Sequence, residues 1–195
     1  MHGIVDVVTS ADMTRSDYGP LRVREARAAD LRHIAPIEDA CGPQFEAHFG
    51  DAIEPILLAP ASTGQWRASK PGFLLVADDG GSTGGGAPRV FGFVHVLVID
   101  GHAHLEQLAV LPAHQRRGIG AALTRAAMAE ARAQGFDRLS LCTYRDVPWN
   151  GPFYRAVGFA EVADLAPYEA RLRERERELG LDVNGVRVVM SVALR

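Results

Sequence analysis

The sequence of 195 residues contains only two cysteines, Cys41 and Cys142, and they do not form a CxxC pair. A disulfide framework needs several spaced cysteines in a small secreted chain, so we expect free thiols and a reducing compartment. No stretch approaches the roughly 20 consecutive apolar residues that cross a bilayer. The first residues also lack a cationic start followed by an apolar run of signal-peptide length. These absences predict a cytoplasmic protein with no membrane partner.

The chain also lacks an excess of positive charge. Lys and Arg total 21 against 24 Asp and Glu, a formal net charge of −3, so we expect no nucleic-acid partner. The composition, 47% hydrophobic and 23% charged, is that of an ordinary globular protein and excludes wholesale disorder. We predict one domain over residues 21–195, preceded by a flexible N-terminal extension over residues 1–20. Met13 is a second candidate for the first residue, so the sequence does not decide whether residues 1–12 belong to the native protein.

Apolar patterns along the chain predict alternating strands and helices. Asp30 is the expected N-cap of the first helix, residues 79–88 are a glycine-rich flexible connection, and residues 169–178 are a solvated helix with a Glu169–Arg173 pair. This order indicates an α/β sheet covered by helices. Strands are expected at residues 21–24, 73–77, 90–99, 104–111, 139–143, from 159, and at 186–194; helices are expected at 31–40, within 43–70, and at 118–134, 151–157 and 169–178.

Residues 105–121 contain the most informative local pattern, a strand, a short arginine-containing loop and a helix that opens at two glycines. The first amides of a helix have no internal partner, and the helix dipole places partial positive charge there. Gly118 and Gly120 lack side chains that would keep a ligand from the backbone, and Arg116 and Arg117 add charge. The pattern predicts a pyrophosphate site. The alternative is a glycine-containing helix start with solvent-facing arginines, and the missing Walker lysine argues against nucleoside triphosphates.

Two motifs in this order resemble the GNAT superfamily of N-acetyltransferases. Residues 115–120, Gln-Arg-Arg-Gly-Ile-Gly, match its Gln/Arg-x-x-Gly-x-Gly/Ala signature, and residues 108–112, Leu-Ala-Val-Leu-Pro, are similar to its acetyl-CoA-binding strand. Residues 150–159, Asn-Gly-Pro-Phe-Tyr-Arg-Ala-Val-Gly-Phe, look like its Asn…Phe/Leu-Tyr-x-x-x-Gly-Phe element. Gly151 and Pro152 shorten the usual spacing between Asn and Tyr. The resemblance covers residues 21–195.

The resemblance implies a single-domain, GNAT-like mixed sheet, mostly antiparallel, with helices on both faces. Two strands would splay beside a bulge in the strand at residues 104–111, and pantetheine would pair with Leu108 and Val110 as an added strand. A main-chain amide near Ala109 or Val110 would stabilise the oxyanion, and the amides of residues 116–121 would hold the pyrophosphate of acetyl-CoA, the co-substrate. The residues implied in cofactor binding are Leu108, Ala109, Val110, Gln115, Arg116, Arg117, Gly118, Ile119, Gly120, Ala121, Asn150 and Phe153.

Acetyl transfer to an amine involves two proton transfers. An alkylammonium with a pKa of about 10 must lose a proton, and the departing thiolate benefits from a donor. The resemblance places Tyr154 near the sulfur of CoA as the acid, and its alternative role is packing on the sheet. Glu106, a charge inside an apolar strand, is the expected base, directly or through water; a salt bridge at the strand end is the alternative. His104 is a second candidate base.

The expected activity is direct transfer of an acetyl group from acetyl-CoA to a primary amine of a small molecule, peptide or protein in a ternary complex. The alternatives are a non-catalytic acyl-CoA-binding or sensory module, and a transferase of the same fold with a longer acyl donor. His95, His102 and His104 lack the further ligands of a known metal site, so no metal is expected. Acceptor specificity is expected in residues 36–70 and near Tyr168, and an exposed terminal strand would favour a homodimer.

Overall fold

The computed structural model describes residues 21–81 and 88–195. The predicted extension at residues 1–20, and residues 82–87 of the predicted glycine-rich connection, lie outside this part. The strands and helices fall close to the expected bounds. In chain order they are β1 (Arg22–Glu25), α1 (Leu31–Asp39), α2 (Gly42–Phe49), η1 (Gly50–Ala52), η2 (Pro55–Leu58), α3 (Gly64–Ala68), β2 (Gly72–Asp78), β3 (Val90–Ile99), β4 (His102–Val110), η3 (Pro112–His114), α4 (Ile119–Ala133), β5 (Arg138–Tyr144), α5 (Gly151–Ala156), β6 (Ala160–Glu161), α6 (Pro167–Glu178), η4 (Leu181–Asn184) and β7 (Arg187–Ala193). Among the described helices, none has both the length and the apolar character that a bilayer crossing requires.

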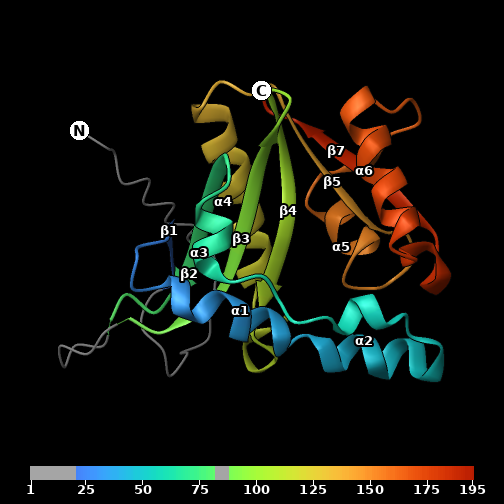
Figure 1. The fold of residues 1–195 in the computed structure, drawn as a ribbon. Helices are drawn as coiled ribbons and strands as arrows, with labels where there is room; N and C mark the ends of the chain where they lie inside the picture. The colour runs from blue at the N-terminus through green and yellow to red at the C-terminus, as the bar shows by residue number, and fades with distance from the viewer. Residues whose placement is uncertain (1–20, 82–87) are drawn as a thin grey trace.

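The strands form one 7-stranded sheet in the order β1-β2-β3-β4-β5-β7-β6 (Figure 1). β4 and β5 are parallel, and the other neighbouring pairs are antiparallel. The predicted mixed, mostly antiparallel sheet is therefore confirmed. The C-terminal strand β7 pairs with β5 along one side, and on the other side the short β6 pairs with Met190 and Ser191. The expected homodimer stays a prediction.

Helices cover both faces of the sheet, as predicted. In β2, Leu75 and Ala77 belong to the core under α4, whereas Leu74 and Val76 belong to the core under α1, as the alternation of a strand requires. Figure 1 shows α4 on one face and α1 with α3 on the other. The helices contribute apolar side chains spaced three or four residues apart, which are Leu123, Ala127 and Ala131 from α4 and Ile34 and Ile37 from α1.

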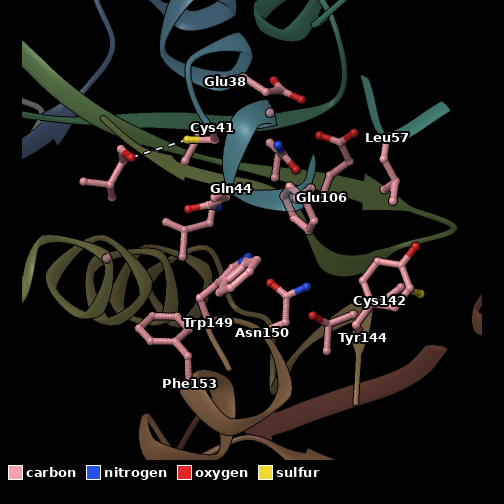
Figure 2. A pocket seen from close by; sticks show the side chains of 18 of the residues that line it. Glu38, Cys41, Gln44, Leu57, Glu106, Cys142, Tyr144, Trp149, Asn150 and Phe153 are labelled. Atoms are coloured by element: carbon pink, nitrogen blue, oxygen red, sulfur yellow. Dashed lines mark hydrogen bonds between the residues drawn. The ribbon is translucent and has the colours of Figure 1, made fainter. Parts of the chain in front are cut away.

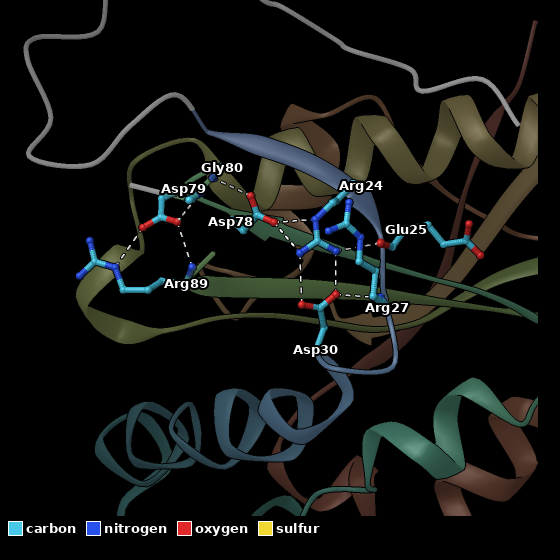
Figure 3. A network of polar contacts seen from close by, with 9 residues as sticks. Arg24, Glu25, Arg27, Asp30, Asp78, Asp79, Gly80 and Arg89 are labelled. Atoms are coloured by element: carbon cyan, nitrogen blue, oxygen red, sulfur yellow. Dashed lines mark hydrogen bonds and ion pairs between the residues drawn. The ribbon is translucent and has the colours of Figure 1, made fainter. Parts of the chain in front are cut away.

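An ionic network fixes the start of α1 (Figure 3). Arg24 of β1 donates hydrogen bonds to Asp30, at 2.6 and 3.1 Å, and to Asp78 of β2, at 2.6 Å. The carboxylate of Asp30 also accepts from the amide of Arg27 at 2.7 Å. The helix begins at Leu31 as predicted, but the side chain of Asp30 does not cap it, because these partners occupy the carboxylate. Burial opposes ionisation of Asp30, and the Arg24 and Arg27 bonds outweigh it and lower its pKa.

The prediction that α6 is a solvated helix is wrong on one side. Glu169 is fully buried, and its carboxylate accepts a hydrogen bond of 2.6 Å from Arg138 instead of pairing with Arg173. Arg173 is also buried and donates to Asp182 at 2.7 Å. Alternating charges in sequence favour exposure by default, and these partners offset the cost of burial together with Tyr168, which donates to Glu169, and Glu176, which accepts from Arg173.

β4 and β5 run together only at their starts. They pair over residues 103–105 and no further. The register of β3 with β4 skips Glu106, because His95 opposes Gln107 and the next residue of β3 opposes Leu105. Glu106 is therefore the extra residue of a β-bulge, which bends the strand away from its neighbour. The predicted bulge and splayed strand pair are confirmed.

Candidate active site

A cleft of about 1390 Å³ opens where β4 and β5 diverge. Its walls come from β4 and the following loop, the N-terminus of α4, the end of β5 with α5, and the segment from α1 to η2. Figure 2 shows Glu38 and Glu106 on one side of it and Asn150 and Phe153 on the opposite side. The predicted site residues that line the cleft are Glu106, Leu108, Ala109, Val110, Gln115, Arg116, Gly118, Gly120, Ala121, Asn150, Phe153 and Tyr154.

Two predicted cofactor residues, Arg117 and Ile119, are not among the described residues that line the cleft. The side chain of Ile119 is buried in the core under α4. The α-helical turn explains this, because Ile119 and Gly120 project from different sides of the helix. The two arginines are therefore not equivalent, since only Arg116 faces the cleft.

Beyond the bulge, β4 has a backbone edge without a partner strand in the described part of the chain. The amide of Leu111 donates to Phe91 of β3 at 2.8 Å. Because backbone groups of an antiparallel strand alternate in direction, Ala109 also faces β3, and Leu108 and Val110 face the cleft. The carbonyl of Val110 already accepts hydrogen bonds from the side chains of Gln115 and Cys41. The remaining groups of Leu108 and Val110 fit the predicted pairing with an extended ligand, and of the two predicted oxyanion donors only Val110 has its amide on that side.

The N-terminus of α4 lies at one end of this edge. Gly118 precedes the helix with φ +80, a left-handed conformation that suits glycine. A Cβ at Gly118 would meet no atom within 4 Å, and one at Gly120 would come no closer than 3.5 Å to Phe153. Protein packing therefore leaves open space above Gly118, and a side chain at Gly120 would contact Phe153. That space, beside helix amides without intrahelical partners, fits a pyrophosphate.

α5 forms the opposite wall and explains a departure from the family motif. Asn150 precedes the helix and lines the cleft, and its carbonyl accepts from the amide of Tyr154 at 2.9 Å. A Cβ at Gly151 would lie 2.1 Å from the carbonyl oxygen of Arg145. The chain thus requires glycine at position 151, because two backbone segments touch there.

Tyr154 belongs to both the cleft wall and the core. It lines the cleft, yet only 8% of the residue is exposed, and its ring contacts Phe153 at 5.0 Å and Phe159 at 5.6 Å between centroids. Burial raises the pKa of its hydroxyl well above the ordinary value, so the group stays protonated at neutral pH. The packing role and the position at the cleft are therefore combined in one residue.

Glu106 lies at the bulge, with one-third of its side chain exposed, and contacts the buried Arg67 and His95. Its Oε2 accepts hydrogen bonds from Arg67 and, at 3.1 Å, contacts Nδ1 of His95. Arg67 also donates to Glu38 at 2.6 Å. Burial opposes the ionisation of Glu106, but the bond to His95 and the charge of Arg67 outweigh it and lower its pKa. Glu106 is therefore ionised at neutral pH, and the predicted alternative, a salt bridge, exists together with exposure to the cleft.

The histidines have other partners. Nδ1 of His104 lies 2.9 Å from Oγ of Ser140, and burial lowers the pKa of His104 to about 4, so this imidazole is neutral and a weak base. The ring of His102 stacks on Tyr168 at 4.5 Å. The described residues contain no group of three or more His, Cys, Asp or Glu side chains arranged for a metal ion.

Some residues of the site are not found by sequence reasoning. Glu38 and Arg67 lie within the segment 36–70 that is expected to contact the acceptor, but no local pattern singles them out. Tyr168, near which acceptor contacts are also expected, is buried at 3% exposure. Leu172 and Glu176 of the same helix line the cleft instead.

Three features define the class of acyltransferases that use an acyl-CoA. They are a splayed pair of parallel strands, an open strand edge, and a helix N-terminus preceded by a glycine. The family model of the acetyltransferase (GNAT) family matches residues 36–159. The chain belongs to this family, which confirms the resemblance seen in the two motifs. It is an acyltransferase, and the family transfers acetyl groups from acetyl-CoA.

Solved structures share the fold at low sequence identity. An acetyltransferase of the GNAT family from Staphylococcus aureus Mu50 is 15% identical, with 90% of this chain and 100% of that chain covered and a TM-score of 0.62. The PaiA N-acetyltransferase from Thermoplasma acidophilum, in complex with coenzyme A, is 16% identical, with 89% and 99% covered and a TM-score of 0.62. The ribosomal-protein-S18-alanine N-acetyltransferase from Escherichia coli is 18% identical, with 90% and 94% covered and a TM-score of 0.57.

Proposed function

We propose that this enzyme transfers the acetyl group of acetyl-CoA directly to a primary amine in a ternary complex. The observation that carries the proposal is the continuity of the cleft, which runs from the N-terminus of α4 along the open edge of β4 to Glu106. The pyrophosphate binds the amides of residues 116–121, and pantetheine pairs with Leu108 and Val110. The acetyl group then lies at the Glu106 end of this edge, and the amide of Val110 faces pantetheine.

The charge of the far end of the cleft favours a cationic acceptor. Glu38, Arg67 and Glu106 are in contact, and their formal charges sum to −1 because one guanidinium neutralises only one of the two carboxylates. An alkylammonium with a pKa of about 10 is positively charged at neutral pH and is attracted to this end. The acceptor is therefore a protonated primary amine of a small molecule, peptide or protein.

The reaction requires Glu106 as proton acceptor. The bound ammonium first loses one proton to solvent water, because only the free amine has the lone pair that attacks. The amine nitrogen then bonds to the carbonyl carbon of the thioester and becomes more acidic as it does so. Its proton passes to the carboxylate of Glu106, directly or through one water, and the C–S bond then breaks. A carboxylate with a lowered pKa is a weak base, so it acts on the nitrogen during bond formation and not on the free ammonium.

Tyr154 assists the departing thiolate. A thiol has a pKa of about 8.5, whereas burial raises the pKa of Tyr154 above that of a free phenol. Complete transfer of the phenolic proton to the thiolate is therefore uphill. Tyr154 instead donates a hydrogen bond that stabilises the developing charge on sulfur, and it stays protonated over the working pH range.

The direct test is release of CoA from acetyl-CoA with a panel of amines that differ in charge. Alkylamines, and peptides whose free N-terminal amine is protonated at pH 7.5, should react. Glu106→Gln should lower kcat by about 100-fold or more. Glu46→Gln is the matched control, because Glu46 also lines the cleft but forms no ion pair with a described residue. Tight CoA binding without release by any amine would contradict the proposal and favour a binding module. Comparison with longer acyl-CoAs tests the acyl preference.

A further inference from the structure

Arg67 is buried beneath the cleft wall because of how α3 packs on α1. Oγ1 of Thr63 accepts from the amide of Trp66 at 3.2 Å and begins the short helix. A Cβ at Gly64 would lie 2.3 Å from the carbonyl oxygen of Leu31, so glycine permits the close contact of the two helices. Arg67, one turn further on, is only 3% exposed.

The guanidinium of Arg67 joins groups from three other elements. It donates to Oε2 of Glu38 on α1 at 2.6 Å and to Oε2 of Glu106 on β4, and it lies 3.3 Å from Nδ1 of His95 on β3. Its carbon also lies 5.6 Å from the ring centroid of Phe93. Neither carboxylate accepts a hydrogen bond at Oε1 from the described residues, and both residues line the cleft.

We propose that Arg67 is a positioning residue for the transfer reaction. It holds Oε2 of Glu106 behind the cleft wall, which leaves Oε1 for the acceptor nitrogen and keeps the carboxylate ionised. Glu38 competes for the same guanidinium and sets how strongly Glu106 is held. This inference rests on the proposed function, in which Glu106 takes the proton of the acceptor.

The charges around Glu106 predict effects of opposite sign for the two partners. The titratable groups that face Glu106 are Arg67 from α3, His95 from β3 and Glu38 from α1, and His104 adjoins it on β4. Loss of Arg67 removes a positive charge and raises the pKa of Glu106. Loss of the charge of Glu38 removes a competing carboxylate and lowers that pKa.

A purely structural salt bridge predicts a different outcome. Removing one partner of a buried pair destabilises the fold, because the other charge remains buried and unpaired. Both single variants would then lose stability, but kcat per folded molecule would stay as in the wild type. The double variant Glu38→Gln/Arg67→Met removes one charge of each sign, so the net charge of the cluster does not change. It should therefore be more stable than either single variant.

The experiment is a carbon-13 NMR titration of the Glu106 carboxyl in CoA-bound protein, assigned with Glu106→Gln. Arg67→Met should raise the pKa of Glu106 by about one unit or more and Glu38→Gln should lower it, with the double variant between them. Arg67→Met should also lower kcat about 10-fold or more with an unchanged KM for acetyl-CoA. Arg67→Lys, which keeps the charge but not the planar fork, should restore the pKa and only part of kcat.

The inference would be overturned if Arg67→Met and Glu38→Gln shifted the pKa of Glu106 in the same direction. It would also be overturned if this pKa stayed at the wild-type value in both Arg67→Met and the double variant. The titration needs no turnover, so its failure is distinct from failure of the proposed function. If the two variants shift the pKa of Glu106 in opposite directions but no amine releases CoA from acetyl-CoA, the interaction between Arg67 and Glu106 is supported and only the transfer reaction is refuted.

Discussion

The side-chain amide of Gln115 donates a hydrogen bond of 3.0 Å to the main-chain oxygen of Val110. The thiol of Cys41 donates to the same oxygen at 3.4 Å. These contacts tie the loop before α4 to the end of the open strand edge, so the turn proposed to bind phosphate and the strand proposed to bind pantetheine form one unit. They also occupy the carbonyl of Val110, which leaves its amide as the group that can pair with pantetheine.

Gly118→Val should lower the affinity for acetyl-CoA at least about 10-fold. The left-handed conformation at φ +80 costs a residue with a Cβ about 1–2 kcal/mol, and the new side chain enters the space meant for phosphate. Isothermal titration calorimetry measures the affinity, and thermal unfolding measures the strain.

Gly135→Val is the matched control for this substitution. Gly135 has φ +88 and also meets no atom within 4 Å of an added Cβ, but it follows the far end of α4. The same loss of stability with normal acetyl-CoA affinity is expected. If Gly118→Val and Gly135→Val bound acetyl-CoA with equal affinity, backbone strain alone would explain the effect of the substitution at Gly118.

Arg116→Ala should raise the KM for acetyl-CoA about 10-fold with little change in kcat, because Arg116 faces the cleft beside the predicted phosphate site. Arg117→Ala makes the same change in net charge and should alter KM by less than about twofold. The difference should shrink at high salt, since screening weakens the phosphate contact. Identical KM values for the two variants at low salt would remove Arg116 from the site.

Tyr154→Phe should lower kcat about 10- to 100-fold and leave the Kd for acetyl-CoA within about threefold. The ring that packs on Phe153 and Phe159 is retained, so the melting temperature should stay near that of the wild type. Tyr168→Phe is the control, because its hydroxyl lies 3.0 Å from Ser140 in the interior and not at the cleft. A normal kcat in Tyr154→Phe would leave Tyr154 as a packing residue alone.

The glycine turn at the start of α4 could be predicted from sequence because its determinants are local. A strand, two glycines and a helix follow one another within residues 105–121, and helix termini bind anions wherever they occur. Gly118 and Gly120 lie where that reasoning expects them. The unequal placement of Arg116 and Arg117 could not be predicted, because it depends on the conformation of the loop, in which Arg116 has φ +60.

The Glu38–Arg67–Glu106 cluster could not be predicted from sequence. Its members lie on α1, α3 and β4, and no spacing relates them. Their contact depends on the packing of α3 against α1 and on the bulge in β4, both of which are tertiary features. The same holds for Glu169, whose charge pattern indicates exposure and whose burial depends on Arg138.

Acidification should destabilise the protein through His104. Burial lowers the pKa of His104 from 6.5 to about 4, so between these values the unfolded chain binds a proton that the folded protein does not. Stability therefore falls as the pH falls from 6.5 to 4, by about 3 kcal/mol in total from this group. Urea unfolding of the wild type and His104→Asn at several pH values measures it. The variant should show a smaller slope in this range, and equal slopes would refute the assignment.

A crystal structure of the protein with CoA shows whether the diphosphate binds the main-chain amides where residues 116–121 enter α4, with pantetheine along Leu108 and Val110. We expect phosphate oxygens within hydrogen-bond distance of those amides and the thiol beside Glu106 and Tyr154. CoA bound elsewhere, with this turn left without a ligand, would refute the proposed function.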